Sequence, residues 1–164
     1  MKRLIFLDID GVLNSAQFIA ENTNGEGVII VDGAFDATSH IDPLRVERLN
    51  RLIAATHAEV VLSSSWRRLF GVEKTQFSLK AKGFAYEIAD STVRMPGHPR
   101  QAEIESYLSS FTVRPPFVIL DDATEAGIGF GKNFIHIHDG LEEEHIEQAR
   151  RILLNSETLG EHLA

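Results

Sequence analysis

The fold is decided by residues 4–11, which read LIFLDIDG. The first four residues are apolar and branched or aromatic, as is typical of a buried β-strand. Asp8 and Asp10 follow the strand directly, and Gly11 allows the backbone to turn tightly beside a ligand. Because ligands of open parallel sheets bind at the carboxyl ends of the strands, this stretch predicts a functional edge there.

Three further apolar runs resemble this strand: residues 59–62 (EVVL), 117–120 (FVIL) and 134–137 (FIHI). The first of them is followed by three consecutive serines at 63–65, and the second by two aspartates at 121–122. Polar side chains therefore follow at least three of the predicted strands at the point where each strand ends.

Helical patterns separate these runs. Asp42 and Pro43 predict a helix start, with Asp as the N-cap and Pro at the first helical position. The apolar face of that helix is expected to consist of Leu44, Leu49, Leu52 and Ile53. Pro99 can open a second helix, and residues 142–154 form a third. Strands that alternate with helices predict an α/β fold, a Rossmann-like three-layer sandwich with a mostly parallel central sheet.

One domain is expected over residues 1–164, because a chain of this length buries enough surface for one self-supporting core. Residues 14–40 fit the strand–helix alternation poorly. They contain a turn signal at residues 22–27 and a short apolar run at 28–31. We interpret this segment as a hairpin and loop inserted after the first strand.

Composition narrows the function classes. Apolar residues make up 43% and charged residues 24% of the chain, which is ordinary for a globular protein. The chain has no cysteine, which excludes disulfides and thiolate zinc sites. The net charge of −8 disfavours non-specific nucleic-acid binding, and no apolar stretch is long enough to cross a membrane. We expect a soluble, cytoplasmic protein.

Four carboxylates are expected to meet at one edge of the sheet: Asp8, Asp10, Asp121 and Asp122. Without compensation they would repel one another and destabilise the fold. A hard divalent cation resolves the repulsion, and a ligand set made only of oxygen favours Mg²⁺ over zinc. The same cation would offset the charge of an incoming phosphate.

These residues suit the transfer of a phosphoryl group. Asp8 is the expected nucleophile, because carboxylates can form aspartyl-phosphate intermediates. Asp10 could protonate the leaving oxygen and later deprotonate water. Ser63 would contact phosphate oxygens, and Arg100 would stabilise the transition state. Asp122, helped by Asp121, would hold the metal.

The segment DIDGVLN at 8–14 resembles motif I of the haloacid dehalogenase (HAD) superfamily. Ser63 resembles its motif II, and the Asp121–Asp122 pair its acidic motif IV. Within the superfamily, the segment SSSWR at 63–67 and the short insert are similar to HAD domains associated with RNA-repair proteins. The resemblance implies that Asp8 and Asp122 bind Mg²⁺ through their side chains and Asp10 through its carbonyl. The lack of a large insertion implies a minimal cap and an open site.

Two assignments stay open at this level. Three consecutive serines leave both Ser63 and Ser64 as phosphate-binding candidates, and the run could instead cap a helix that begins near Trp66. Arg100 lies 21 residues before Asp121 at a helix start and fits the cationic motif III. Arg94 competes with it for that role.

The sequence thus predicts a Mg²⁺-dependent phosphatase that hydrolyses a phosphate monoester through an intermediate on Asp8. The substrate class and the oligomeric state stay open. One alternative is a nucleic-acid end phosphatase in repair, which the narrower resemblance favours and the acidic charge disfavours. Another is a HAD-like module that binds phosphate without hydrolysis. The intact pair of Asp8 and Asp10 argues against it, because a pure binder has no need of a general acid.

Overall fold

The core of the computed structural model is a parallel sheet of five strands in the order β5-β4-β1-β6-β7. The structure describes residues 1–23, 29–31 and 34–155. The strands are β1 (Leu4–Leu7), β4 (Glu59–Leu62), β5 (Ile88–Ser91), β6 (Phe117–Asp121) and β7 (Phe134–His136). This arrangement confirms the predicted α/β fold.

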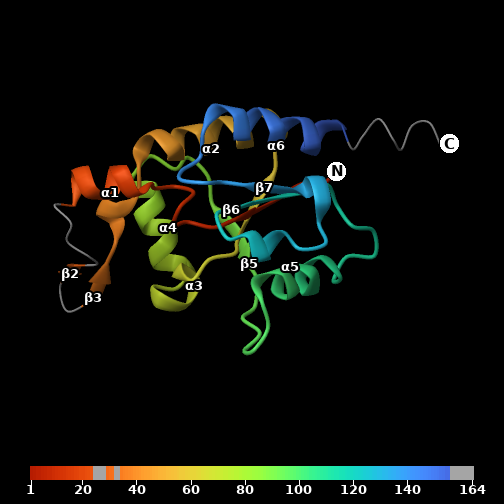
Figure 1. The fold of residues 1–164 in the computed structure, drawn as a ribbon, viewed down its shortest axis with the longest axis horizontal. Helices are drawn as coiled ribbons and strands as arrows, with labels where there is room; N and C mark the ends of the chain where they lie inside the picture. Colours follow the sequence, from red (N-terminus) through yellow and green to blue (C-terminus); the bar gives the residue numbers. More distant parts are fainter. Residues whose placement is uncertain (24–28, 32–33, 156–164) are drawn as a thin grey trace.

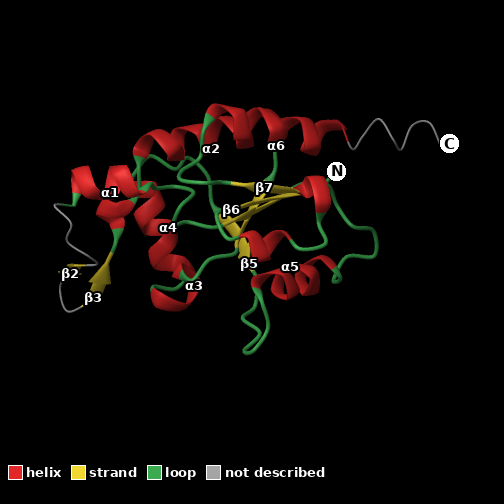
Figure 2. Cartoon of the chain, viewed as in Figure 1, coloured by secondary structure: helices red, strands yellow, loops and turns green. Residues whose placement is uncertain are grey.

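Helices cover both faces of the sheet (Figure 1). Helices α2 (Pro43–Thr56) and α6 (Glu143–Asn155) lie side by side on one face, and α5 (Arg100–Leu108) lies on the other (Figure 2). The remaining helices are α1 (Ala16–Asn22), α3 (Trp66–Leu69) and α4 (Val72–Ala81), with short 3-10 turns η1 (Thr38–His40), η2 (Thr124–Gly127) and η3 (Gly131–Asn133). None of the described helices is long and apolar enough to cross a membrane.

The central strand β1 is apolar throughout because both of its faces are covered. Successive side chains of a strand point to opposite faces, so they enter two different cores. Ile5 and Leu7 pack in the core that contains residues of α2 and α6. Leu4 and Phe6 pack in the second core, with Ile104 of α5.

The start of α2 follows the sequence signal. The Asp42 carboxylate accepts a hydrogen bond from the Leu44 N–H at 2.9 Å, and Pro43 occupies the first turn. The expectation that Leu44 faces the core is wrong, since its side chain is 54% exposed. Leu44 lies in the first turn of α2, and the buried residues of the helix begin at Val46.

Some elements differ from the prediction. Strand β5 and helix α4 were not expected, β6 extends one residue further to Asp121, and β7 ends one residue earlier at His136. Between β1 and α2 lie α1 and an antiparallel pair of strands, β2 (Ile29–Val31) and β3 (Ala34–Asp36). The turn expected at residues 22–27 lies mostly outside the described residues.

The register of the sheet brings the polar strand ends to one level. Leu7 of β1 pairs with Leu62 of β4 and Leu120 of β6. The Asp8 N–H donates to the Leu120 carbonyl at 3.0 Å, and the Ser63 N–H donates to the Leu7 carbonyl at 2.8 Å. Asp8, Ser63 and Asp121 therefore lie side by side along the carboxyl edge of the sheet.

Candidate active site at the carboxyl edge of the sheet

Three carboxylates form a cluster at this edge. One oxygen each from Asp8, Asp121 and Asp122 lie within 4.8 Å of one another. Asp8 is 4% exposed and Asp121 is fully buried, whereas Asp122 is exposed. The Asp10 side chain is not part of this cluster and lies at the surface. The cluster thus combines two buried acids with one that faces solvent.

A single arginine lies between the two buried acids. The Arg100 Nη1 lies 3.0 Å from Asp8 Oδ2 and 2.6 Å from Asp121 Oδ2. The first turn of α5 supplies this side chain, directly after Pro99. Arg94 is exposed and has no hydrogen bond or ion pair with any residue of the described chain. Of the two candidate cations, Arg100 is the one that the fold places against the acidic cluster.

One arginine does not compensate two buried carboxylates. Burial and the neighbouring Asp121 raise the pKa of Asp8 to about 8, although the Arg100 guanidinium and hydrogen bonds from Ser64 and Ile9 act in the opposite direction. Burial also raises the pKa of Asp121. The site therefore holds more acid groups than its own cation can keep ionised at neutral pH.

The chemistry of these groups fits a divalent cation. Ligands on Mg²⁺ at about 2.0–2.1 Å are all oxygens and are separated by roughly 3–4 Å, so three carboxylate oxygens within 4.8 Å can converge on one ion by small side-chain movements. The positive charge of such a cation would also favour the ionised form of Asp8, whose pKa is raised by burial and by Asp121.

We expect the metal-free protein to lose stability as the pH rises from 3.8 towards 8. Over this range the folded state keeps the Asp8 proton that the unfolded state has already released, so the free energy of unfolding falls by up to about 1.4 kcal/mol per pH unit. Mg²⁺ at the cluster would bind the ionised carboxylates, so excess MgCl₂ should raise the unfolding temperature more at about pH 8 than at about pH 5.

Thermal unfolding scans with MgCl₂ or EDTA at several pH values would measure this effect. Asp90→Asn is the matched control, because Asp90 is exposed in β5 and is not part of the acidic cluster, so the variant should leave the metal-dependent shift unchanged. A shift of the same size at every pH would contradict the link between Asp8 and the metal.

The two candidate serines differ in their hydrogen bonds. The buried Ser63 Oγ has no hydrogen-bond partner within the described residues. The Ser64 hydroxyl donates to the Asp8 carboxylate and accepts from the Trp66 N–H at 3.2 Å. Since a buried hydroxyl without a partner is costly, Ser63 is the serine with hydrogen-bonding capacity left for a ligand.

Asp10 is held by two side chains that come from different segments. The indole N–H of Trp66 donates to Asp10 Oδ2 at 3.0 Å, and the Asn14 amide donates to Asp10 Oδ1 at 3.0 Å. Asn14 in turn accepts from the Gly11 N–H at 2.8 Å. Trp66 is buried and packs against Phe70, and its contact with Asp10 was not predicted from the sequence. The only sequence feature that pointed to this contact was the indole N–H of Trp66, which follows directly after the serine run.

Gly11 provides space as well as a turn. Its φ is +76°, a conformation that other residues rarely adopt. A Cβ at this position would come within 2.4 Å of Asp122 Oδ2. Gly11 thus allows the loop after β1 to pack directly against Asp122.

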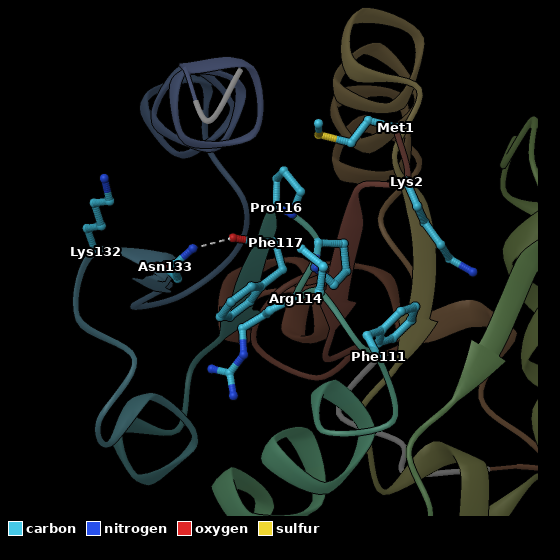
Figure 3. A pocket seen from close by; sticks show the side chains of 10 residues that line it. Met1, Lys2, Phe111, Arg114, Pro116, Phe117, Lys132 and Asn133 are labelled. Carbon is cyan, nitrogen blue, oxygen red and sulfur yellow. Dashed lines mark hydrogen bonds between the residues drawn. The ribbon is translucent and has the colours of Figure 1, made fainter. Parts of the chain in front are cut away.

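A cavity lies at the end of the sheet opposite the acidic cluster, where the strands begin (Figure 3). It measures about 610 Å³ and is lined by Met1, Lys2, Phe111, Phe117 and neighbouring residues, where Asn133 donates to the Phe117 carbonyl at 2.7 Å. No carboxylate is among its lining residues within the described chain. This cavity has no group that resembles the acid chemistry of the carboxyl edge.

Comparison with known proteins agrees with this geometry. The model of one protein family, the HAD domain in Swiss Army Knife RNA repair proteins, matches residues 4–146. No curated protein matches the chain. The matched region runs from β1 through the start of α6 and includes every residue of the acidic cluster. Both the superfamily resemblance and the narrower RNA-repair resemblance are confirmed, and they support a phosphohydrolase of the HAD type in general. The chain belongs to the family of HAD domains found in Swiss Army Knife RNA repair proteins.

Proposed function

We propose that the protein is a Mg²⁺-dependent phosphatase that transfers the phosphoryl group of a phosphate monoester to Asp8 and then to water. The observation that carries the proposal is the Asp8 carboxylate itself. It is buried beside Asp121 and Arg100. Ser63, whose hydroxyl has no partner among the described residues, follows the neighbouring strand at the same level. A nucleophile and a cation thus meet at the edge of the sheet, and the adjacent strand end carries a hydroxyl that is free to bind a ligand.

In the first step, an Asp8 oxygen attacks phosphorus and the bond to the leaving oxygen breaks. Asp10 gives its proton to that oxygen, so an alcohol leaves and the phosphoryl group stays on Asp8. In the second step Asp10 takes a proton from water, which attacks phosphorus and releases inorganic phosphate and the Asp8 carboxylate. Arg100 and Ser63 bind the phosphoryl oxygens in both steps.

Asp8, Asp122 and the Asp10 carbonyl would hold Mg²⁺, with Asp121 beside them. When bound, Mg²⁺ supplies positive charge that keeps Asp8 ionised and offsets the charge of the phosphate. Burial alone would leave Asp8 largely protonated at neutral pH, because its pKa is raised to about 8. A protonated carboxyl is a poor nucleophile, so we expect activity to depend on the cation.

The purified protein is expected to hydrolyse p-nitrophenyl phosphate with Mg²⁺ and to stop when EDTA is added. Release of p-nitrophenol measured with and without the chelator tests this directly. Restoration of turnover by excess MgCl₂ separates removal of the metal from damage to the protein. Unchanged turnover in EDTA would contradict the role of the metal. Phosphate binding without any turnover would favour the non-catalytic alternative.

Phosphorylated nucleic-acid ends are the substrate class that the family description favours, since the matched domains occur in RNA repair proteins. The net charge of −8 does not oppose this class if recognition is confined to the end of the chain. Turnover of 3′- and 5′-phosphorylated oligonucleotides, compared with phosphopeptides and sugar phosphates, tests the assignment.

A further inference from the structure

A small arginine-rich pocket opens beside the proposed active site. It measures about 250 Å³, and its lining includes Arg67, Arg68, Arg94 and Arg100. Arg100 belongs to both places, because it lines the pocket and lies 3.0 Å from Asp8 Oδ2. A group in this pocket would therefore be a direct neighbour of the phosphoryl group at Asp8.

Arg67 and Glu103 neutralise each other at the base of this arginine pocket. Arg67 Nη2 forms a salt bridge with Glu103 Oε2, and Arg67 Nη1 donates to the Ser64 carbonyl at 2.8 Å. Both side chains are largely buried. The other oxygen of Glu103 accepts from the Met95 N–H at 2.9 Å. Arg67 and Glu103 thus line the pocket as a neutral pair, and Arg67 has no uncompensated positive charge with which to bind a ligand.

Arg68 and Arg94 are in a different situation. Both are exposed, and neither guanidinium has a hydrogen bond or an ion pair with any other described residue. Every other arginine of the chain has at least one such partner; these are Arg3, Arg45, Arg48, Arg51, Arg67, Arg100, Arg114, Arg150 and Arg151. In a protein with a net charge of −8, the two arginines without a partner line the same pocket.

We propose that Arg68 and Arg94 bind a second phosphate group of the substrate, one linkage away from the phosphate that Asp8 attacks. The proposal rests on the proposed function of the Asp8 site. A guanidinium presents a planar fork of N–H donors that matches phosphate oxygens, and two of them facing one pocket favour a dianion or a phosphodiester over a neutral group. Glu125 also lines the pocket, and its negative charge opposes this binding.

The substrate recognised by both sites together is a phosphate monoester that carries a second phosphate group nearby. A polynucleotide end supplies it as a phosphodiester, and a nucleoside bisphosphate supplies it as a second monoester. Because the protein as a whole is acidic, phosphates beyond the second are not expected to add affinity. An oligonucleotide longer than two nucleotides should therefore be hydrolysed at nearly the same rate as a dinucleotide.

The test compares phosphorylated dinucleotides that differ only in the charge of their internal linkage. Steady-state kinetics would be measured for 3′- and 5′-phosphorylated dinucleotides with a natural phosphodiester, and for the same compounds with a neutral methylphosphonate. The natural linkage is expected to raise kcat/KM by about tenfold, mainly through a lower KM. The double variant Arg68→Gln/Arg94→Gln is expected to reduce this ratio to about one.

Two control variants bracket the effect. Lys132→Gln removes one positive charge at the opposite end of the sheet and should leave the ratio unchanged. Glu125→Gln removes the opposing charge and should increase the ratio about twofold. Because all of these side chains are exposed, thermal unfolding is expected to show that each variant folds.

Equal kcat/KM for the two linkages, or a preference that survives the double variant, would overturn the proposal. Nucleoside bisphosphates compared with the matching monophosphates form a second arm. If the second phosphate of a bisphosphate also raises kcat/KM, and the double variant loses this gain, the site accepts any second phosphate. If only the dinucleotides show the gain, the site is specific for polynucleotide ends.

Failure of the proposed function would look different, because no phosphate monoester would be hydrolysed at all. Equilibrium binding of the same dinucleotides to the wild-type protein and the double variant would then decide. Tighter binding of the natural linkage that the double variant loses supports the arginine pocket, and equal binding overturns it.

Discussion

An Asp8→Asn variant is expected to lose phosphatase turnover by at least about 10⁴-fold and, without metal at about pH 8, to be more stable than the wild-type protein. Turnover falls because the amide keeps the shape of the side chain but cannot attack phosphorus. Stability rises because the substitution removes a buried acid whose pKa is raised to about 8. The gain should be at least about 1 kcal/mol and should shrink as the pH falls.

This pairing of lost activity with gained stability distinguishes a catalytic role from a structural one. Substitution of a residue needed only for folding would lower activity and stability together. Activity assays and thermal unfolding in EDTA, run on the same preparations, measure the two quantities. Asp90→Asn makes the same chemical change at an exposed site and should alter neither. Wild-type turnover in Asp8→Asn would rule out the covalent mechanism.

Asp10→Asn is expected to slow turnover by roughly 10²–10⁴-fold, the usual contribution of general acid–base help. The loss should depend on the leaving group. An alkyl phosphate needs its leaving oxygen protonated, whereas p-nitrophenolate leaves readily without a proton. We therefore expect kcat for an alkyl phosphate to fall further than kcat for p-nitrophenyl phosphate. Equal losses for both substrates would argue against Asp10 as the general acid.

Trp66→Phe serves as the companion variant, because it keeps an aromatic ring in the core while it removes the N–H that holds Asp10, together with the five-membered part of the indole. A positioning residue should show the same leaving-group dependence as Asp10, with a smaller loss of about tenfold or less. A purely structural role would lower the unfolding temperature and leave the ratio between the two substrates unchanged.

The sequence predicted the strands that carry the site because both faces of each are buried. Strands β1, β4 and β6 are apolar except for Glu59 at the start of β4 and Asp121 at the end of β6, and the polar residues at their ends were sufficient to predict that the aspartates lie at one edge. Strand β5 was missed because it is an edge strand, with Ala89 and Asp90 exposed and no apolar run to identify it. Helix α4 was missed because Gly71, at its N-cap, provides no side-chain capping signal.

Side-chain partners were harder to foresee than strands. Arg94 and Arg100 both precede β6 and carry the same charge, and only the path of the chain into α5 places Arg100 between Asp8 and Asp121. The contact of Trp66 with Asp10 spans 56 positions and depends on how α3 packs against the loop after β1. Such contacts depend on three-dimensional packing, which local sequence patterns do not encode.

The close approach of Gly11 to Asp122 links two loops that are far apart in the chain. A methyl group at position 11 would displace the Asp122 carboxylate and force the backbone out of its φ of +76°. Neither loop can therefore be redesigned alone. Transplanting this acidic cluster onto another parallel sheet would require both loops to be moved as a matched set, and we expect sequence changes in either loop to be tolerated only with glycine retained at position 11.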